Sequence, residues 1–168
     1  LANRHPRVEV LRPGPGVGGH CIAVDPWFIV DSAPEETPLI QAARAVNDGK
    51  PAHVAALVEE AVSGMDDPCI ACLGLAYKAD TDDLRQSPSV DVARALCRDG
   101  RRLLVVEPHV TDLPSDLAEA PDVTHAELDQ ALAEADVVGL LTDHRAFHDV
   151  DPARLAGKRV IDTRGLWR

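Results

Sequence analysis

The stretch CIACLGLAY, residues 69–77, decides the fold. It is a short, apolar run that follows Asp66-Asp67-Pro68, a sequence that ends helices. Short apolar runs of this kind are typical of a β-strand buried on both faces, as the strands of parallel sheets are. We therefore expect residues 69–77 to form the first strand of an α/β domain.

Helix-like and strand-like segments alternate through the rest of the chain. Ser87 is expected to cap a helix whose first position is Pro88, because both residue types favour these positions. Alternation of this kind predicts parallel strands joined by right-handed crossovers. The fold class is therefore α/β, a Rossmann-like open parallel sheet with flanking helices. The expected segments are a helix over 88–99, a strand over 103–108, a helix over 126–135, and strands over 136–143 and 158–165.

Two further regions precede the sheet. Residues 1–36 are rich in Gly and Pro, whereas residues 37–64 carry apolar side chains at helical spacing. Gly49 and Pro51 should interrupt this long helix and give either a kink or two helices. We therefore expect three parts: a loop segment over 1–36, a connecting helix over 37–64 and the sheet domain over 65–168.

The composition limits the classes of function. The 168 residues suffice for one domain of ordinary size. Hydrophobic residues make up 45% of the chain and aromatic residues only 3%, which predicts a core of Ala, Val and Leu. The net charge of −11 argues against a nucleic-acid partner, since no basic stripe could offset it. An anionic ligand would need a local cluster of Arg and Lys.

No targeting or membrane signal is evident in the sequence. No apolar run reaches the roughly 18 residues that a membrane-spanning helix needs. The opening LANRHPRVEV has neither an initiator Met nor a charged-then-apolar leader, and it reads as part of something longer. We expect a cytoplasmic location, in which the four Cys stay reduced.

Polar side chains follow the ends of the predicted strands, where open parallel sheets bind ligands. Lys78, Arg85 and Arg164 fall at this edge and would supply positive charge to an otherwise acidic chain. Lys78 and Arg85, close to a helix N-terminus, are suited to an anion. A solvated acidic loop is the alternative for this segment. The other polar residues of this edge are Asp80, Asp82, Asp83, Glu107, His109, Thr142, Asp143, His144 and Asp162.

A second unusual stretch is GPGVGGHCIAVDP, residues 14–26. Cys21 could be a small buried hydrophobe or, in this polar Gly-rich context, a nucleophile, and the residue types leave both open. His20 is not its base, since neighbours on an extended chain point to opposite faces. A zinc site would need two more ligands at suitable spacing, so we expect no metal. The glycines do not fit G-x-G-x-x-G and follow no strand, so they do not predict a dinucleotide site.

The remaining cysteines are expected to be structural. Cys69 and Cys72 form a C-x-x-C, but a redox motif would begin a helix. Here the pair lies in a strand, where three residues of separation place the side chains on opposite faces. Cys97, on the helix after Pro88, is expected to join the core as well.

These stretches together resemble the UDP-glucose/GDP-mannose dehydrogenase family. Residues 14–26 resemble its catalytic-cysteine segment, and GLAYKADTDDLRQSP, residues 74–88, resembles the signature of its C-terminal nucleotide-sugar-binding domain. The closing VIDTRGLWR resembles the last strand of that domain. The form GGHCIAVDPWFI is more similar to the UDP-N-acetyl-D-mannosamine 6-dehydrogenase branch than to the UDP-glucose branch, where Ser commonly precedes the Cys.

The resemblance implies a reaction and a set of site residues. Such enzymes oxidise the C6 alcohol of a UDP-sugar to a carboxylate with two equivalents of NAD, through a thiohemiacetal and a thioester on the cysteine. Cys21 matches this nucleophile, and Asp25 matches an Asp that assists the hydrolytic water. Arg85 matches a residue that reaches NAD. The positions that match substrate contacts are His5, Arg7, Gly18, Tyr77, Lys78 and Arg164.

The same resemblance implies what the chain lacks. The family binds NAD on an N-terminal Rossmann domain and carries a catalytic Lys on a central helix, and neither is found in these residues. We therefore expect a C-terminal portion that forms part of a homodimer and has no dehydrogenase activity alone. UDP-glucose, UDP-N-acetylglucosamine and GDP-mannose stay open as substrates. A stand-alone nucleotide-sugar-binding module is the alternative of another class, and a cysteine hydrolase would need a His aligned with Cys21.

Overall fold

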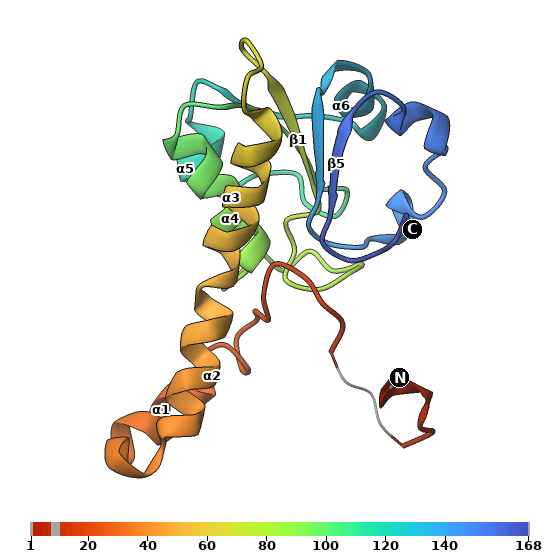
Figure 1. The fold of residues 1–168 in the computed structure, drawn as a ribbon. Coiled ribbons are helices and arrows are strands. Elements are labelled where there is room, and N and C mark those ends of the chain that lie inside the picture. Colours follow the sequence, from red (N-terminus) through yellow and green to blue (C-terminus); the bar gives the residue numbers. More distant parts are fainter. Residues whose placement is uncertain (1, 8–10, 168) are drawn as a thin grey trace.

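The computed structural model describes residues 2–7 and 11–167, and its centre is one sheet of five strands (Figure 1). The order is β3-β2-β1-β4-β5, and every neighbouring pair is parallel. The prediction of an open parallel α/β sheet is confirmed. The direction of strand addition reverses between β1 and β4. The strands are β1 (Cys69–Leu73), β2 (Arg102–Val106), β3 (Val123–His125), β4 (Val137–Leu140) and β5 (Arg159–Asp162).

The sequence prediction of four strands was wrong by one. β3 has three residues at an edge of the sheet, and none of its side chains is buried, so no apolar run marks it. The first predicted strand was also too long, since β1 ends at Leu73. Gly74 follows with φ +85°, a left-handed backbone conformation that residues other than Gly rarely adopt. The chain turns out of the sheet there.

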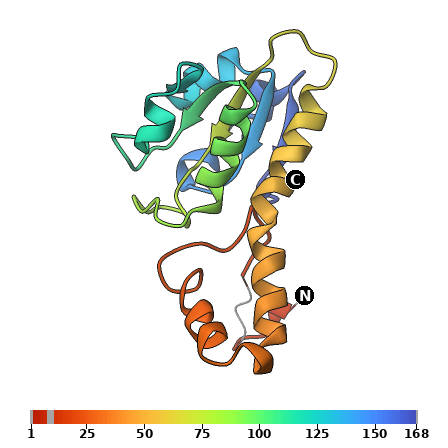
Figure 2. The same ribbon diagram turned by 90° about the vertical axis from the view of Figure 1, so that its left-hand side faces the viewer.

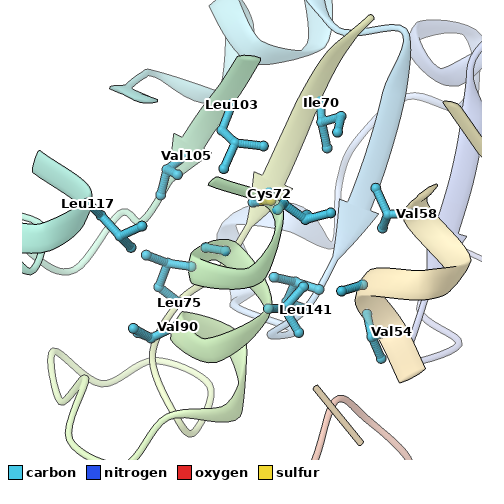
Figure 3. Packing of buried hydrophobic residues seen from close by; sticks show 14 of the residues in the cluster. Val54, Val58, Ile70, Cys72, Leu75, Val90, Leu103, Val105, Leu117 and Leu141 are labelled. Atoms are coloured by element: carbon cyan, nitrogen blue, oxygen red, sulfur yellow. The ribbon is translucent and has the colours of Figure 1, made fainter. Parts of the chain in front are cut away.

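Helices cover both faces of the sheet and enclose two apolar clusters. Figure 3 shows Ile70 and Cys72 of β1 pointing toward the helices of one face. Cys69, Ala71 and Leu73 point to the other face, as the alternation of a strand requires. The first face is covered by α3 (Lys50–Val62), α4 (Pro88–Arg98) and α5 (Ser115–Ala118), and the second by α6 (Leu128–Glu134), η3 (Arg145–Phe147) and η4 (Pro152–Leu155).

The core is mostly Ala, Val and Leu, as the low aromatic content predicts. Ile70 and Phe147 are exceptions, and both are fully buried. The structural role of Cys69 and Cys72 is confirmed, because both are buried and belong to opposite clusters. Cys97 is only half-buried and packs at the margin of the first cluster, so it is less central than we predicted.

The region before the sheet is a helical arm. α2 (Pro38–Asp48) and α3 are separated by Gly49 alone, which confirms the predicted interruption. Gly49 keeps right-handed helical angles (φ −80°, ψ −10°), so Figure 2 shows α2 continuing the line of α3 away from the sheet. Pro51 is tolerated because it lies in the first turn of α3, where its missing N–H has no helical partner.

α1 (Asp25–Ser32) packs against α2 at the far end of this arm, with η2 (Pro34–Glu36) between them. η1 (Ala2–Arg4) lies near the N-terminus. Among the described residues, no helix has the length and apolar character needed to cross a bilayer. On α1 and α2, the exposed large apolar side chains are Trp27, Phe28, Ile29, Leu39 and Val46.

Ser87 is the N-cap residue of α4, as predicted, and Pro88 is its first position. However, its hydroxyl does not cap the helix. Ser87 Oγ instead donates to the carbonyl of Leu75, at 2.6 Å. This bond ties the start of α4 to the turn after β1.

Candidate functional site

The carboxyl ends of β1 and β4 meet where the strand order reverses, the usual position of ligands in open parallel sheets. The two connections pack tightly there. A Cβ on Gly74 would lie 2.6 Å from the carbonyl oxygen of Thr142, so this position requires Gly. The Thr142 hydroxyl donates to the Ala76 carbonyl at 2.7 Å and lies 3.1 Å from the hydroxyl of Ser89.

The buried carboxylate of Glu107 holds the backbone at this edge of the sheet. Oε2 of Glu107, at the end of β2, accepts the N–H groups of Leu75 and Ala76 at 2.7 and 2.9 Å. Nε2 of His144 lies 3.1 Å from the same oxygen, and both side chains are fully buried. Burial would raise the pKa of Glu107, but these hydrogen bonds outweigh it and hold that pKa below its ordinary value.

His144 continues the network to the loop after β1. Its Nδ1 accepts the N–H of Asp80 at 2.9 Å, so the ring proton resides on Nε2, facing Glu107. Asp80 has φ +57° and receives hydrogen bonds from both the backbone and the side chain of Arg145, which lower the pKa of its carboxyl. Residues that follow two other strands, β2 and β4, thus hold the shape of this loop.

Within the described residues, Asp80, His109 and His144 bring possible metal-ligand atoms within 4.8 Å of one another. However, both ring nitrogens of His144 already take part in hydrogen bonds. We therefore assign the cluster to hydrogen bonding rather than to a metal site.

The Gly-rich segment packs onto the loop after β1, although the two are far apart in sequence. Gly19 N–H donates to the Gln86 carbonyl at 3.3 Å. A Cβ on Gly18 would overlap this same carbonyl and the ring of Pro88. A Cβ on Gly19 would lie 2.8 Å from the ring of Tyr77. The glycines therefore permit close contact between two protein segments, and Tyr77 packs on one of them.

Helix α2 holds the same segment from its other side. Oδ1 of Asn47 accepts the N–H of Val17 at 2.7 Å, and Nδ2 of Asn47 donates to the carbonyl of Val17 at 3.0 Å. The sequence analysis missed Asn47, because a single Asn near a helix end carries no signal of its own. Only the folded chain brings residues 17 and 47 together.

Cys21 is exposed and lies in a turn that leads into α1. Asp25 N–H donates to the Cys21 carbonyl at 2.8 Å, so the backbone of Asp25 lies one helical turn after that of Cys21. Both residues line a cavity of about 610 Å³ formed with α1 and α2. His20 extends toward Asp83 instead, with Nδ1 4.0 Å from its carboxylate.

The three predicted cations differ in their surroundings. Arg85 forms two hydrogen bonds with Asp83, at 2.9 and 2.6 Å, which lower the pKa of the Asp83 carboxyl to about 2. Arg164 pairs with Asp143 at 2.8 Å and lies against Gly14. Lys78 is exposed and forms no ion pair with the residues that the structure describes. The local positive charge is therefore smaller than the residue types suggested.

His5 and Arg7 lie in the exposed N-terminal segment. Arg7 N–H donates to Nδ1 of His5 at 3.2 Å. In the part of the chain that the structure covers, neither side chain has a hydrogen bond or ion pair to the Cys21 segment. The structure thus brings Gly18 against Tyr77 and Cys21 into the cavity with Asp25, but it joins neither His5 nor Arg7 to them.

The sheet order and its crowded carboxyl edge are those of a Rossmann-like α/β domain. The model for the UDP-binding domain of the UDP-glucose/GDP-mannose dehydrogenase family matches residues 71–168, and the model for the central domain of that family matches residues 1–49. The chain therefore belongs to the UDP-glucose/GDP-mannose dehydrogenase family, as the sequence resemblance predicted.

Individual relatives agree with this assignment. The chain is 53% identical to an NDP-N-acetyl-D-galactosaminuronic acid dehydrogenase from Ralstonia solanacearum, over 99% of this chain and 39% of the relative. It is 49% identical to a UDP-N-acetyl-D-mannosamine dehydrogenase from Yersinia pestis, over 100% of this chain and 42% of the relative. A solved UDP-D-ManNAc dehydrogenase from Pyrococcus horikoshii superposes with a TM-score of 0.78 at 33% identity, covering 99% of this chain and 39% of that one. The chain thus spans about two fifths of the length of these relatives.

Proposed function

We propose that this chain is the sugar-nucleotide-binding part of an NAD-dependent dehydrogenase that oxidises the C6 alcohol of a UDP-sugar to a carboxylate. The observation that carries the proposal is the packing of the Cys21 segment onto the loop after β1. Gly18 and Gly19 contact this loop at the edge where open parallel sheets bind ligands, and the exposed Cys21 follows Gly19 by two residues, which supports a thiol acting near that edge. In this proposal, residues 1–36, which include α1, form the catalytic-cysteine segment, 37–64 the connecting helices α2 and α3, and 65–168 the UDP-sugar-binding domain.

We propose UDP-N-acetyl-D-mannosamine as the sugar nucleotide. The Yersinia and Pyrococcus relatives are named for this sugar, and the Ralstonia relative for another N-acetylated sugar. An N-acetylated substrate is therefore common to all three names. The carboxylated product would be a precursor for a surface polysaccharide. UDP-N-acetylglucosamine, UDP-glucose and GDP-mannose are the competing substrates.

Cys21 would be the nucleophile. Its thiolate adds to the C6 aldehyde to form a carbon–sulfur bond, and the sugar carbon stays on Cys21 as a thiohemiacetal and then as a thioester. Asp25, one turn away, orients the water that releases the carboxylate and restores the thiol. NAD, when bound, supplies the hydride acceptor for the two oxidation steps.

The other predicted residues have binding roles in this proposal. Lys78, an exposed cation without an ion pair in the described chain, would contact the substrate, with Tyr77 and Gly18 beside it. Arg85 would reach NAD, and it fits this role because its side chain is 69% exposed and its guanidinium keeps N–H groups beyond those given to Asp83. Arg164 would face the nucleotide. His5 and Arg7 would contact the ligand of a neighbouring subunit rather than a ligand at this edge of the sheet.

A homodimer in the cytoplasm is part of the proposal. The exposed apolar side chains of α1 and α2 form a surface that a second protein segment would cover favourably. Sedimentation equilibrium of the protein tests this point. A monomer at all concentrations would contradict it.

The binding step is tested on the chain itself. Calorimetric titration with UDP should show saturable binding, and Lys78→Ala should raise the dissociation constant about tenfold through loss of a charge-assisted contact. Lys50→Ala is the matched control, since Lys50 is an exposed lysine at the start of α3. Equal dissociation constants for the two variants would contradict the role of Lys78.

The chemical step is tested in a protein of the relatives' full length, which extends well beyond this chain. Cys21→Ser should abolish steady-state NAD reduction with UDP-N-acetyl-D-mannosamine, because a hydroxyl is a far weaker nucleophile than a thiolate. Cys97→Ser, at a half-buried cysteine on α4, is the control and should retain turnover. Full turnover by Cys21→Ser would refute the nucleophile. UDP binding without turnover by the unaltered protein would favour a stand-alone binding module.

A further inference from the structure

Arg44 is a buried cation in the wall of the Cys21 cavity. It lies on α2, is 8% exposed, and lines the cavity together with Cys21, Asp25 and Asn47. Most other residues of the wall are apolar, among them Val17, Ile22, Ile29 and Leu39. A guanidinium in such surroundings needs partners for its N–H groups, because burial without them is unfavourable.

The guanidinium has too few partners in the described structure. Nη2 donates to the carboxylate of Asp48, and Nη1 donates to the carbonyl of Ile22 over a long 3.4 Å. Nε is buried and has no hydrogen-bond partner. Since a guanidinium carries five N–H donors, most of them are unused.

The ion pair with Asp48 does not account for the burial of Arg44. Asp48 lies one helical turn away, and its side chain is 43% exposed, so this is the ordinary i,i+4 pair of a helix surface. Pairs of this spacing also occur with both partners exposed, so this pair does not require Arg44 to be buried. The unused N–H groups of Nη1 and Nη2, and the cavity that Arg44 lines, point instead to an acceptor that comes from outside.

We propose that Arg44 forms an anion-binding subsite beside Cys21, and that this subsite takes a carboxylate. The long contact with the carbonyl of Ile22 ties the guanidinium to the residue directly after Cys21. A planar guanidinium matches the two oxygens of a carboxylate, and the apolar wall strengthens the attraction. This proposal deepens the proposed function, in which the product is a carboxylate formed at Cys21, but its test requires no dehydrogenase activity.

Asp25 opposes this attraction, because its carboxylate lines the same cavity. The subsite therefore combines one cation and one anion with different exposures. Arg44 is buried and fixed by helix α2, whereas Asp25 is exposed and hydrated. Removal of Arg44 and removal of Asp25 should change the binding of an anion in opposite directions.

Alkylation of Cys21 with two reagents tests the subsite on the chain as it stands. In each reaction, the thiolate forms a bond to carbon and iodide leaves. Iodoacetate carries a carboxylate and iodoacetamide does not, so the ratio of their rate constants reports the local field. Both reagents react with the same ionised thiol, so a change in its accessibility or ionisation alters both rates equally and leaves their ratio unchanged. Mass spectrometry of the peptide assigns the reaction to Cys21, the one exposed cysteine of the four.

Arg44→Gln should lower the ratio of the iodoacetate rate to the iodoacetamide rate about tenfold, the usual effect of a lost charge-assisted contact. Asp25→Asn should raise it. Arg12→Gln removes the same charge from an exposed residue outside the cavity and should change the ratio less than about twofold, because solvent screens it. Asn47→Ala removes the two hydrogen bonds to Val17 and loosens the Gly-rich segment. It should change the iodoacetate and iodoacetamide rates by the same factor.

An unchanged ratio in Arg44→Gln would overturn the subsite, even if Cys21 remained the nucleophile of the proposed dehydrogenase. Should this variant fail to fold, the unaltered chain provides the test. Acetate should slow iodoacetate saturably and more than chloride at the same ionic strength, and the absence of that difference would overturn the proposal. Normal turnover by Cys21→Ser would refute the dehydrogenase mechanism and leave the subsite standing.

Discussion

Nε2 of His144 lies 3.1 Å from Oε2 of Glu107, and both side chains are fully buried. Glu107 also holds the backbone after β1 through the N–H groups of Leu75 and Ala76. His144 reaches the same connection further on, at the N–H of Asp80. One buried pair thus joins the ends of β1, β2 and β4 and shapes the loop that carries Lys78.

The first prediction concerns acid stability. Because the pKa of Glu107 is lower in the folded chain than its ordinary value of 4.5, ionised Glu107 stabilises the fold above about pH 4.5. This stabilisation should be lost as the pH falls through the lowered pKa. Glu107→Gln should cost about 2–4 kcal/mol at pH 7 and flatten the pH dependence below 4.5, as measured by urea unfolding.

Glu60→Gln serves as the control for this prediction. Glu60 is exposed on α3, so its replacement should change the free energy of unfolding by less than about 0.5 kcal/mol. If Glu107→Gln showed the same acid dependence as the unaltered chain, the buried carboxylate would not control acid stability.

The second prediction concerns alkaline stability. Burial raises the pKa of the Cys72 thiol from 9.0 to about 12. The unfolded chain therefore releases this proton first, and the free energy of unfolding should fall between pH 9 and about pH 12, by about 1.4 kcal/mol per pH unit from this group. Cys72→Ala should be less stable at pH 7 yet show a shallower decline in this window.

Val90→Ala is the matched variant, since Val90 is buried in the same apolar cluster as Cys72 but does not ionise. It should lose stability by a similar mechanism, a small cavity, and keep the steep alkaline decline. If the free energy of unfolding fell equally steeply between pH 9 and about pH 12 in both variants, ionisation of Cys72 would not be the cause of the alkaline decline.

The third prediction contrasts Ala substitutions at two glycines, Gly18 and Gly49. A Cβ on Gly18 would overlap the Gln86 carbonyl and Pro88, so Gly18→Ala should detach the Cys21 segment from the loop after β1. Faster hydrogen exchange at the Gly19 amide, which donates to Gln86, would report this change. An unchanged exchange rate would mean that the packing does not depend on this glycine.

Gly49→Ala should have the opposite effect on stability. Gly49 has helical backbone angles, and an added Cβ would meet only ordinary contacts at 3.4 Å. The substitution should raise the free energy of unfolding by about 0.5–1 kcal/mol through reduced freedom of the unfolded chain. Thermal unfolding of the two variants side by side provides the comparison.

The fourth prediction concerns Asn47. Asn47→Asp keeps an oxygen that accepts from Val17 N–H but loses the donor to the Val17 carbonyl, whereas Asn47→Ala loses both bonds. Hydrogen exchange at Val17 should therefore rise in Asn47→Ala and much less in Asn47→Asp. Similar exchange in both variants would indicate that the N–H to Oδ1 bond does not hold the segment.

Much of the fold follows from local patterns. Three features of the fold were predictable, because burial on both faces and helix breaking change the local composition of the sequence. They are the apolar run at Cys69, the Ser87-Pro88 start of α4 and the interruption at Gly49. β3 left no such mark, since a short edge strand buries little and is formed by its pairing with β2.

The candidate site was readable only in part. Cys21, Asp25 and Lys78 stand in motifs, and these motifs resemble the family to which the chain belongs. Asn47, Arg44 and Glu107 stand in no motif, because each acts through a partner at least 20 residues away or through burial alone. The partly neutralised state of Arg85 and Arg164 was likewise invisible from residue types.

The sequence by itself determined the class of the sheet, the alternation of four of its strands with helices, and the family, since these depend on hydrophobic pattern and local motifs. Only the tertiary structure decided that the Gly-rich segment lies between Asn47 and the loop after β1, and that Glu107 and His144 are buried together. The physical reason is that hydrogen bonds and burial between distant residues depend on how the elements pack, which no local stretch of sequence records.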